Sequence, residues 1–160
     1  MPLPQRNSYR ARFHDYSGGK YFITICTKDK IHYFGKIFDG EMHFSEIGQF
    51  AVNFLDNLSK HYSYADVPQF VVMPNHIHAV IFIETKPGEE IIMPQTRSAL
   101  SVVVGGFKQA VTCFARRNNY EFGWQERYHD HIIRGLKDGN QISDYIEKNV
   151  ILWDLDCFNK

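Results

Sequence analysis

Two histidines one residue apart, His76 and His78, open an apolar run that continues to Phe82. Side chains alternate across a β-strand, so an i,i+2 pair projects both imidazoles from one face, close enough together to share one cation. The pair follows the tight Pro74-Asn75 corner, and functional groups gather where a strand end meets solvent. Neutral imidazoles suit a divalent ion, although a histidine on an apolar strand is more often a hydrogen-bonded core residue. The spacing therefore indicates a metal site, which needs a third ligand from elsewhere, or a polar part of the core.

A second candidate group lies near the C-terminus. Tyr145 and Asn149 are four residues apart, in a segment whose apolar stripe predicts a helix from about Asn140 to Trp153. Residues at this spacing share one helical face, one turn apart. A tyrosine with its hydroxyl at the rim of a packed sheet explains the same pattern without chemistry.

The segment 124–134 competes for the same role because it is dense in polar, aromatic and ionisable groups. It contains another His-x-His pair, His129 and His131, and a tyrosine next to that pair, Tyr128. Tyr128 is therefore a rival nucleophile, and a contribution from His131 stays open. The alternative is a strand whose charged members face water.

The elements that must position these residues follow from periodicity and turn signals. Strands are predicted at 21–27, 33–37, 42–44, 70–73, 76–84 and about 129–134, with a turn at Asp39-Gly40 between the second and the third. Ser45 is predicted to cap a helix whose apolar stripe runs to Tyr62.

A second amphipathic helix is predicted from the apolar stripe between Leu100 and Phe114. The residues before it, 85–97, contain prolines and a glycine and are predicted to form a mobile loop. Gly105-Gly106 costs this helix roughly 1 kcal/mol per glycine relative to alanine. The pair therefore indicates the close approach of another backbone or of a ligand.

Without the hairpin at 33–44, the order of elements is strand, helix, strand, strand, helix, strand, helix. This order predicts an α+β fold: a ferredoxin-like βαββαβ antiparallel sheet with an N-terminal hairpin insertion and an added C-terminal helix. The 160 residues predict one domain, 1–160. The fold plan alone assigns no function.

Composition narrows the class of protein only modestly. No apolar run reaches the roughly 18 residues that span a bilayer, and the first residues lack a signal peptide's apolar core, so we expect a cytoplasmic protein with no membrane partner. The net charge is zero, and three cysteines without a CxxC pair indicate neither a disulfide framework nor a thiolate zinc site. Basic side chains outnumber acidic ones in the first 36 residues, which a phosphate-binding surface and a merely solvated surface explain equally well.

Several motifs, taken in order, resemble the REP-associated tyrosine transposases, relatives of the IS200-like transposases in the HUH single-strand superfamily. The string Met-Pro-Asn-His-Ile-His at 73–78 resembles their HUH motif, and 21–27 with Phe34-Gly35 resembles their N-terminal strands. The match continues in the family's order through the following motifs: Gly106-Phe107-Lys108, Trp124-Gln125, His131-Ile132-Ile133-Arg134, and Tyr145-Ile146 with Asn149. The resemblance spans roughly Arg10 to Trp153.

The resemblance implies an enzyme that cleaves and rejoins hairpin-bearing single-stranded DNA through a 5′-phosphotyrosine. His76, His78 and Asn149 would hold one Mg²⁺ or Mn²⁺, and Tyr145 rather than Tyr128 would be the nucleophile. This chain has Val150 where the family commonly has proline after the asparagine, so the helix is free to continue. Relatives act as dimers or with all groups in one chain, which leaves a monomer and a homodimer open.

Phosphate contacts are expected from basic residues outside the candidate site, namely Lys108, Arg116 and Arg134. Two other functions stay open. One is a non-catalytic or domesticated domain that binds structured DNA without cleaving it. The other is a ferredoxin-like metallohydrolase of small phosphoesters, for which the aromatic and basic surroundings are poorly suited.

Overall fold

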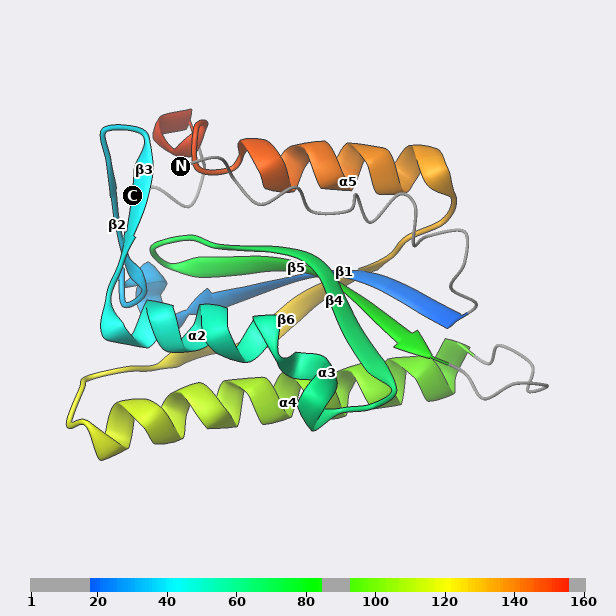
Figure 1. The fold of residues 1–160 in the computed structure, drawn as a ribbon, viewed down its shortest axis with the longest axis horizontal. Coiled ribbons are helices and arrows are strands. Elements are labelled where there is room, and N and C mark those ends of the chain that lie inside the picture. The colour runs from blue at the N-terminus through cyan, green and yellow to red at the C-terminus, as the bar shows by residue number, and fades with distance from the viewer. Residues whose placement is uncertain (1–17, 85–92, 156–160) are drawn as a thin grey trace.

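The computed structural model describes residues 18–84 and 93–155. Their helices and strands are, in order, β1 Gly18–Thr27, η1 Lys28–Lys30, β2 Gly35–Phe38, β3 Glu41–Phe44, α2 Glu46–Asp56, α3 Leu58–His61, β4 Ala65–Val72, β5 His76–Glu84, α4 Met93–Arg117, β6 Trp124–Ile132, α5 Leu136–Lys148 and η2 Trp153–Leu155. The labels are those of Figure 1.

Four strands form one sheet in the order β4-β5-β1-β6, and every neighbouring pair is antiparallel. The predicted hairpin, β2 and β3, pairs separately as a two-stranded sheet. Its turn at Asp39 and Gly40 takes positive φ at both residues, which matches the right-handed twist of a tight hairpin. The ferredoxin-like α+β plan with a hairpin insertion and an added helix is thus confirmed.

The sheet has two differently covered faces, as Figure 1 shows: α2 and α4 lie against one, and α5 lies on the other. Side chains alternate along β5, so Ile77, Ala79 and Ile81 join the α2/α4 core. Val80 and Phe82 instead join a smaller cluster with Ile142 and Ile146 of α5. His76 and His78 share the register of this second set and therefore face α5.

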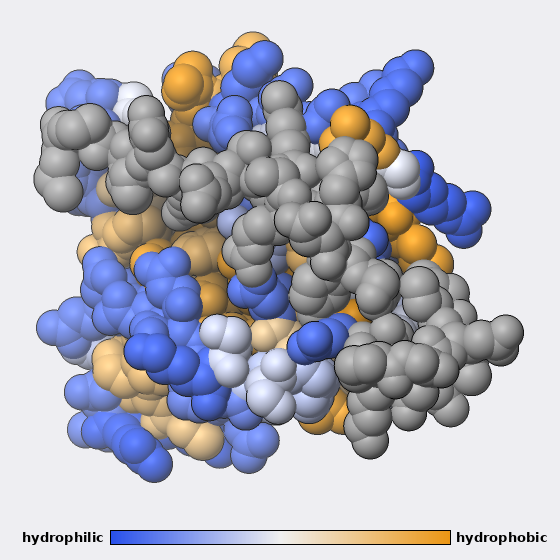
Figure 2. Space-filling view, turned by 45° about the vertical axis from the view of Figure 1, so that its right-hand side comes forward, coloured by the Kyte–Doolittle hydropathy of each residue, from blue (hydrophilic) through white to orange (hydrophobic). Residues whose placement is uncertain are grey.

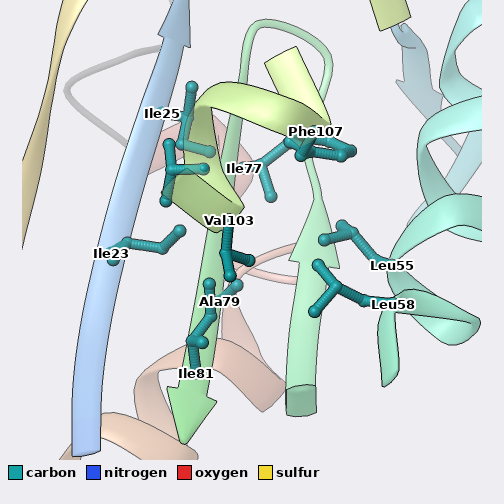
Figure 3. Close-up of a pocket in the computed structure, with 10 residues that line it drawn as sticks. Ile23, Ile25, Leu55, Leu58, Ile77, Ala79, Ile81, Val103 and Phe107 are labelled. Carbon is teal, nitrogen blue, oxygen red and sulfur yellow. The ribbon is translucent and has the colours of Figure 1, made fainter. Parts of the chain in front are cut away.

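The α2/α4 core is close-packed. Figure 3 shows one gap in it, a space of about 10 Å³ lined by aliphatic side chains of β1, β5, α2, α3 and α4 and by the ring of Phe107. That is no more than one water molecule occupies, and its apolar walls offer water no partner. The gap is therefore a packing feature and not a ligand site.

On the side shown in Figure 2, hydrophilic side chains cover much of the described surface and apolar residues show as separate patches.

Helix α4 departs from its predicted start. It begins at Met93, so 93–97 is helical rather than part of a loop, and the rest of the predicted loop, 85–92, lies outside the described residues. Pro94 fits because a helix's first turn does not need its missing N–H. By length and composition alone, the segment Thr96–Arg117 is apolar enough to cross a membrane, a test that the core helix of a soluble protein also passes. In this fold its apolar stripe packs against the sheet.

At Gly106 of α4 the close neighbour is a side chain, and not the other backbone or the ligand that was predicted. A Cβ at this position would lie 1.8 Å from the hydroxyl of Tyr62. Gly105, one residue earlier, has nothing within 4 Å of such a Cβ. Only the second glycine is therefore explained by packing.

Several predicted boundaries were wrong, including the start of β4, at Ala65 rather than 70, and the start of α5, at Leu136 rather than about 140. The first helix stops at Asp56 and a short α3 follows, because the chain breaks at Asn57 although its apolar stripe continues. The last strand begins at Trp124, before the predicted 129. Helix α5 ends at Lys148 rather than continuing to Trp153, and Asn149 is its C-cap.

The Pro74-Asn75 corner is fixed to the end of β1. The carbonyl of Asn75 accepts hydrogen bonds from the backbone N–H and the hydroxyl of Thr27, both at 3.0 Å. The side chain of Asn75, which is fully buried, donates to the carbonyl of Lys30. The first residue of β5, His76, therefore starts from a rigid support.

Candidate active site

His76 and His78 lie on the α5 side of the sheet, with ring centroids 4.7 Å apart. Their side chains are 0% and 2% exposed. Figure 1 shows that the start of β5, the end of β1 and the C-terminal end of α5 meet at one end of the sheet. The predicted pair therefore lies at a strand end, covered by the last helix.

The environment of His76 keeps its ring neutral. Its Nδ1–H donates to Oδ1 of Asn75 at 2.7 Å, so the lone pair is on Nε2. Burial lowers the pKa of His76 to about 4; a side-chain interaction with Asn149 acts in the opposite direction, and the charge of His32 lowers it further. At neutral pH the ring is thus an acceptor or a ligand and not a cation.

His78 is held from two sides. Its Nδ1 shares a hydrogen bond of 2.9 Å with the hydroxyl of Thr24, its neighbour on β1. Phe22 stacks on the ring, with centroids 5.4 Å apart. Nε2 consequently points towards α5, where the hydroxyl of Tyr145 lies 3.4 Å away.

Helix α5 brings Tyr145 and Asn149 to the histidines. Ile142 and Ile146 pack against β5, which sets the rotation of the helix and places Tyr145 on the side next to His78. Asn149 is one turn later and keeps helical φ and ψ, so the predicted i,i+4 relation holds although the helix ends there. Tyr145 is 45% exposed and Asn149 is buried. The four residues predicted from two distant segments therefore meet.

Two further residues complete the surroundings of His76. Trp153 stacks on it with centroids 6.1 Å apart, and His32 packs edge-to-face against Trp153 with centroids 5.7 Å apart. Our prediction from sequence gave neither a role. Trp153 belonged to a recognised apolar stripe, but nothing in the sequence linked His32 to His76.

The rival tyrosine lies elsewhere. Tyr128 pairs with Ile25 across β1 and β6, which places it on the α2/α4 face. Its hydroxyl shares a hydrogen bond of 3.1 Å with Ser101 of α4. His131, on the α5 side, pairs with Asp138 at 2.9 Å instead of joining the candidate site.

The basic residues predicted to contact phosphates are separate from the site. Lys108 donates to the carbonyl of Gln125 at 3.1 Å and lies over the ring of Trp124, so it links α4 to β6. Arg116 is exposed in the last turn of α4, and Arg134 is exposed just before α5. Contacts from these three residues to DNA stay a prediction.

The donor set suits an ion that accepts imidazole nitrogen and amide oxygen. His76 is neutral with its lone pair on Nε2, and Oδ1 of Asn149 is buried, close to His76, without a hydrogen bond of ordinary geometry among the described residues. Within the same residues, no group of three or more His, Cys, Asp or Glu side chains is arranged around one point. Among the described residues, the candidate ligands are thus two imidazole nitrogens and an amide oxygen, a set that Mn²⁺ accepts more readily than Mg²⁺ does.

A solved structure of a REP-associated tyrosine transposase bound to a REP hairpin has a similar fold, with a TM-score of 0.53. The match covers 94% of this chain and 73% of that one at 18% identity. A protein of Deinococcus radiodurans R1, provisionally described as a transposase, matches with a TM-score of 0.45, 16% identity, and coverage of 83% and 92%. The chain thus has the fold of the REP-associated tyrosine transposase.

A sequence relative identifies the family more directly. An uncharacterized protein of Haemophilus influenzae is 37% identical over 167 residues, which covers 96% of this chain and 93% of that protein. The chain belongs to the same family as this Haemophilus protein. It matches no protein-family model.

Proposed function

We propose that the protein is a metal-dependent transposase or endonuclease that cleaves and rejoins hairpin-bearing single-stranded DNA through a covalent link to Tyr145. The observation that carries this proposal is the hydroxyl of Tyr145 at 3.4 Å from Nε2 of His78, beside His76 and Asn149. A half-exposed tyrosine at a histidine pair has the access that a nucleophile needs. The similar fold of a transposase that binds a REP hairpin supports hairpin DNA as the substrate.

His76, His78 and Asn149 would hold the Mg²⁺ or Mn²⁺. When bound, the ion would supply Lewis-acid polarisation of the scissile phosphate. Nδ1 of each histidine already has a hydrogen-bond partner, Asn75 for His76 and Thr24 for His78, and such bonds orient a ligand ring. The chain's own contribution is thus a pair of fixed nitrogen donors facing one helix.

Tyr145 would act on the phosphorus in line with the bond that breaks. The phenolic oxygen forms a bond to phosphorus, the bond from phosphorus to the 3′ oxygen breaks, and the phenolic proton is passed on while the released 3′ oxygen takes up one. The 5′-phosphotyrosine keeps the energy of the phosphodiester. A 3′-hydroxyl can therefore reverse the step and join strands without another energy source.

The nucleophile is tested by trapping the adduct. Wild-type protein is incubated with Mn²⁺ and a hairpin-bearing single strand that carries a label either on the 5′ side or on the 3′ side of the break. Only the strand labelled on the 3′ side should give a labelled, SDS-resistant band. Tyr145→Phe should lose the band completely, and Tyr128→Phe, its matched control on the opposite face, should keep it. A band that survives Tyr145→Phe and disappears in Tyr128→Phe would overturn the assignment.

The metal role is tested without relying on activity. We expect the Mn²⁺ electron paramagnetic resonance signal to report weak binding to the protein alone and tighter binding with DNA, because phosphate oxygens complete the ligand set. His78→Gln should weaken that binding, whereas His131→Gln, in the second His-x-His pair, should not. Equal binding by wild type and His78→Gln would contradict the metal site. Tight hairpin binding without any adduct would instead favour the non-catalytic DNA-binding domain.

A further inference from the structure

An open cleft of about 400 Å³ lies at the same end of the molecule as the candidate site. Its walls come from three connections: the residues after η1, the start of α2 and the turn between α4 and β6. We call it the Tyr33 cleft; its lining includes His32, Tyr33, Ser45, Glu46, Tyr120 and Glu121. Figure 1 shows η1, the start of α2 and the α4–β6 turn at one end of the fold. The volume falls within the usual range of ligand pockets, roughly 300 to 1,000 Å³.

The cleft combines aromatic rings with carboxylates. Tyr33 packs at a tilt against Phe122, with ring centroids 5.1 Å apart and ring planes at 55°, which restricts the orientation of its ring. The hydroxyl of Tyr120 donates to the carboxylate of Glu46. Burial, then the charges of Glu121 and Asp29, raise the pKa of Tyr33, so two carboxylates lie near this tyrosine. The lining therefore offers flat apolar faces and hydrogen-bond acceptors.

Cations lie beside the cleft rather than inside it. Lys28 and Lys30 belong to η1, immediately before His32, and both are exposed. The backbone N–H of Lys28 donates to the carbonyl of Gly123 at 3.0 Å, which ties η1 to the α4–β6 turn. Basic groups thus lie next to the cleft, where they are available to a phosphate backbone, and the carboxylates of Glu46 and Glu121 belong to the lining itself.

The cleft is continuous with the candidate active site. His32 lines the cleft and packs against Trp153 at 5.7 Å, and Trp153 stacks on His76 at 6.1 Å. One indole ring therefore separates the two sites. A strand with a phosphate at Tyr145 that continued past Trp153 would bring another of its bases to this cleft.

We propose that the Tyr33 cleft holds one unpaired base of the DNA strand near the phosphate that Tyr145 attacks, and that it selects bases with an exocyclic amino group against thymine. This inference rests on the proposed function for the position of the strand. Aromatic side chains bind any base by stacking, worth roughly 1–3 kcal/mol per base. Selectivity comes from Glu46 and Glu121, because carboxylates accept N–H bonds from adenine, cytosine and guanine, whereas the exposed edge of thymine carries carbonyl oxygens on both sides of its single N–H.

The test measures binding in the absence of cleavage. The full chain with Tyr145→Phe, in buffer with EDTA, is titrated with tetranucleotides of dA, dC or dT while amide chemical shifts are followed by NMR. Shifts should centre on His32, Tyr33 and Tyr120 for dA and dC. The affinity for dT should be about tenfold lower, as expected for one lost hydrogen bond to a charged group.

Two variants test which groups select the base. In Glu121→Gln the affinities for dA and dC should exceed that for dT by no more than about twofold, because an amide can also donate to a carbonyl oxygen of thymine. Glu126→Gln, at an exposed position of β6, is the matched control and should keep the full preference. Tyr33→Leu should weaken all three tetranucleotides by a similar factor, because it removes stacking without changing the acceptors.

Three outcomes would overturn the proposal: equal affinity for dT and dA, shifts that centre on β6 or α5 rather than on the cleft, and no binding of any tetranucleotide. None of these depends on strand cleavage. A missing covalent adduct would leave the cleft proposal standing, and an adduct with no base preference in the cleft would leave the proposed function standing.

Discussion

The two faces of the central sheet use the same strands for different purposes. The face under α2 and α4 carries the large apolar core, whereas the face under α5 carries a small apolar cluster followed by His76, His78 and Asn149. Since β5 supplies alternate residues to both, one strand contributes to stability on one side and to the candidate site on the other. The division indicates that the α5 face gives up apolar burial to keep polar groups in place.

The different roles of the two faces are tested most directly by changing one residue on each face. Phe107→Ala should lower the free energy of unfolding by about 3–5 kcal/mol, because it opens a cavity under α4 where Phe107 is 1% exposed. Tyr145→Phe should change stability by less than about 0.5 kcal/mol, because it removes one hydroxyl from a half-exposed ring. Urea denaturation measures both.

Activity should show the opposite order. Tyr145→Phe should lose adduct formation, while Phe107→Ala should retain it at a temperature where the variant remains folded. A Tyr145→Phe protein destabilised as much as Phe107→Ala would mean that the α5 face is a second structural core and not a separate site.

Acid should destabilise the protein through the α5 face. His76 has a folded-state pKa of about 4, below the ordinary value of 6.5. Between these two pH values, the histidine is therefore protonated in the unfolded chain but neutral in the folded chain. This contribution is complete above pH 6.5 and is lost as the pH falls towards 4, to a limit of about 3 kcal/mol. Denaturation between pH 7.5 and 4.5 should show the loss.

The variant His76→Gln isolates this contribution, because glutamine does not titrate. Its stability should be lower than that of wild type at pH 7.5, but it should fall less steeply on acidification. If both proteins lose the same free energy between these pH values, a different group determines the acid sensitivity.

Much of the framework was predictable from sequence, and the reasons are local. The β-branched run at 21–27, the Asp39-Gly40 turn and the Ser45 cap each determine their structure within a few residues. The first turns of α4 and the first half of β6 were missed because they carry few apolar residues. The break at Asn57 was missed because the apolar stripe continues through it.

The candidate site was predictable in part. The i,i+2 and i,i+4 spacings identified which residues share a face, and the family resemblance paired them. Periodicity could not show that Tyr145 lies on His78, because that contact joins residues 67 positions apart and depends on which face α5 covers. The roles of His32 and Trp153 around His76 were missed for the same reason.

The glycine pair on α4 sharpens the comparison within the α2/α4 face. Gly106→Ala should cost about 1–3 kcal/mol, because its Cβ would force the hydroxyl of Tyr62 to move within a packed core. Gly105→Ala, with open space around its Cβ, should instead stabilise the helix by up to about 1 kcal/mol. Thermal unfolding of the two variants measures the difference, and equal effects would show that Tyr62 does not confine the helix.

A modest gain in stability is also expected on the α5 face. Gln69 of β4 is buried; its Nε2 donates to the carbonyl of Ser143 at 3.2 Å, while its Oε1 has no hydrogen-bond partner among the described residues. A buried acceptor without a partner costs roughly 1–3 kcal/mol, more than the 0.5–1.5 kcal/mol that one ordinary hydrogen bond contributes. Gln69→Met, which keeps the volume, should therefore raise the free energy of unfolding by up to about 1 kcal/mol, measured in urea. A lower free energy of unfolding would mean that the hydrogen bond from Gln69 stabilises the packing of α5. In that case the polar groups of the α5 face would reduce the stability of the fold less than the comparison of the two faces implies.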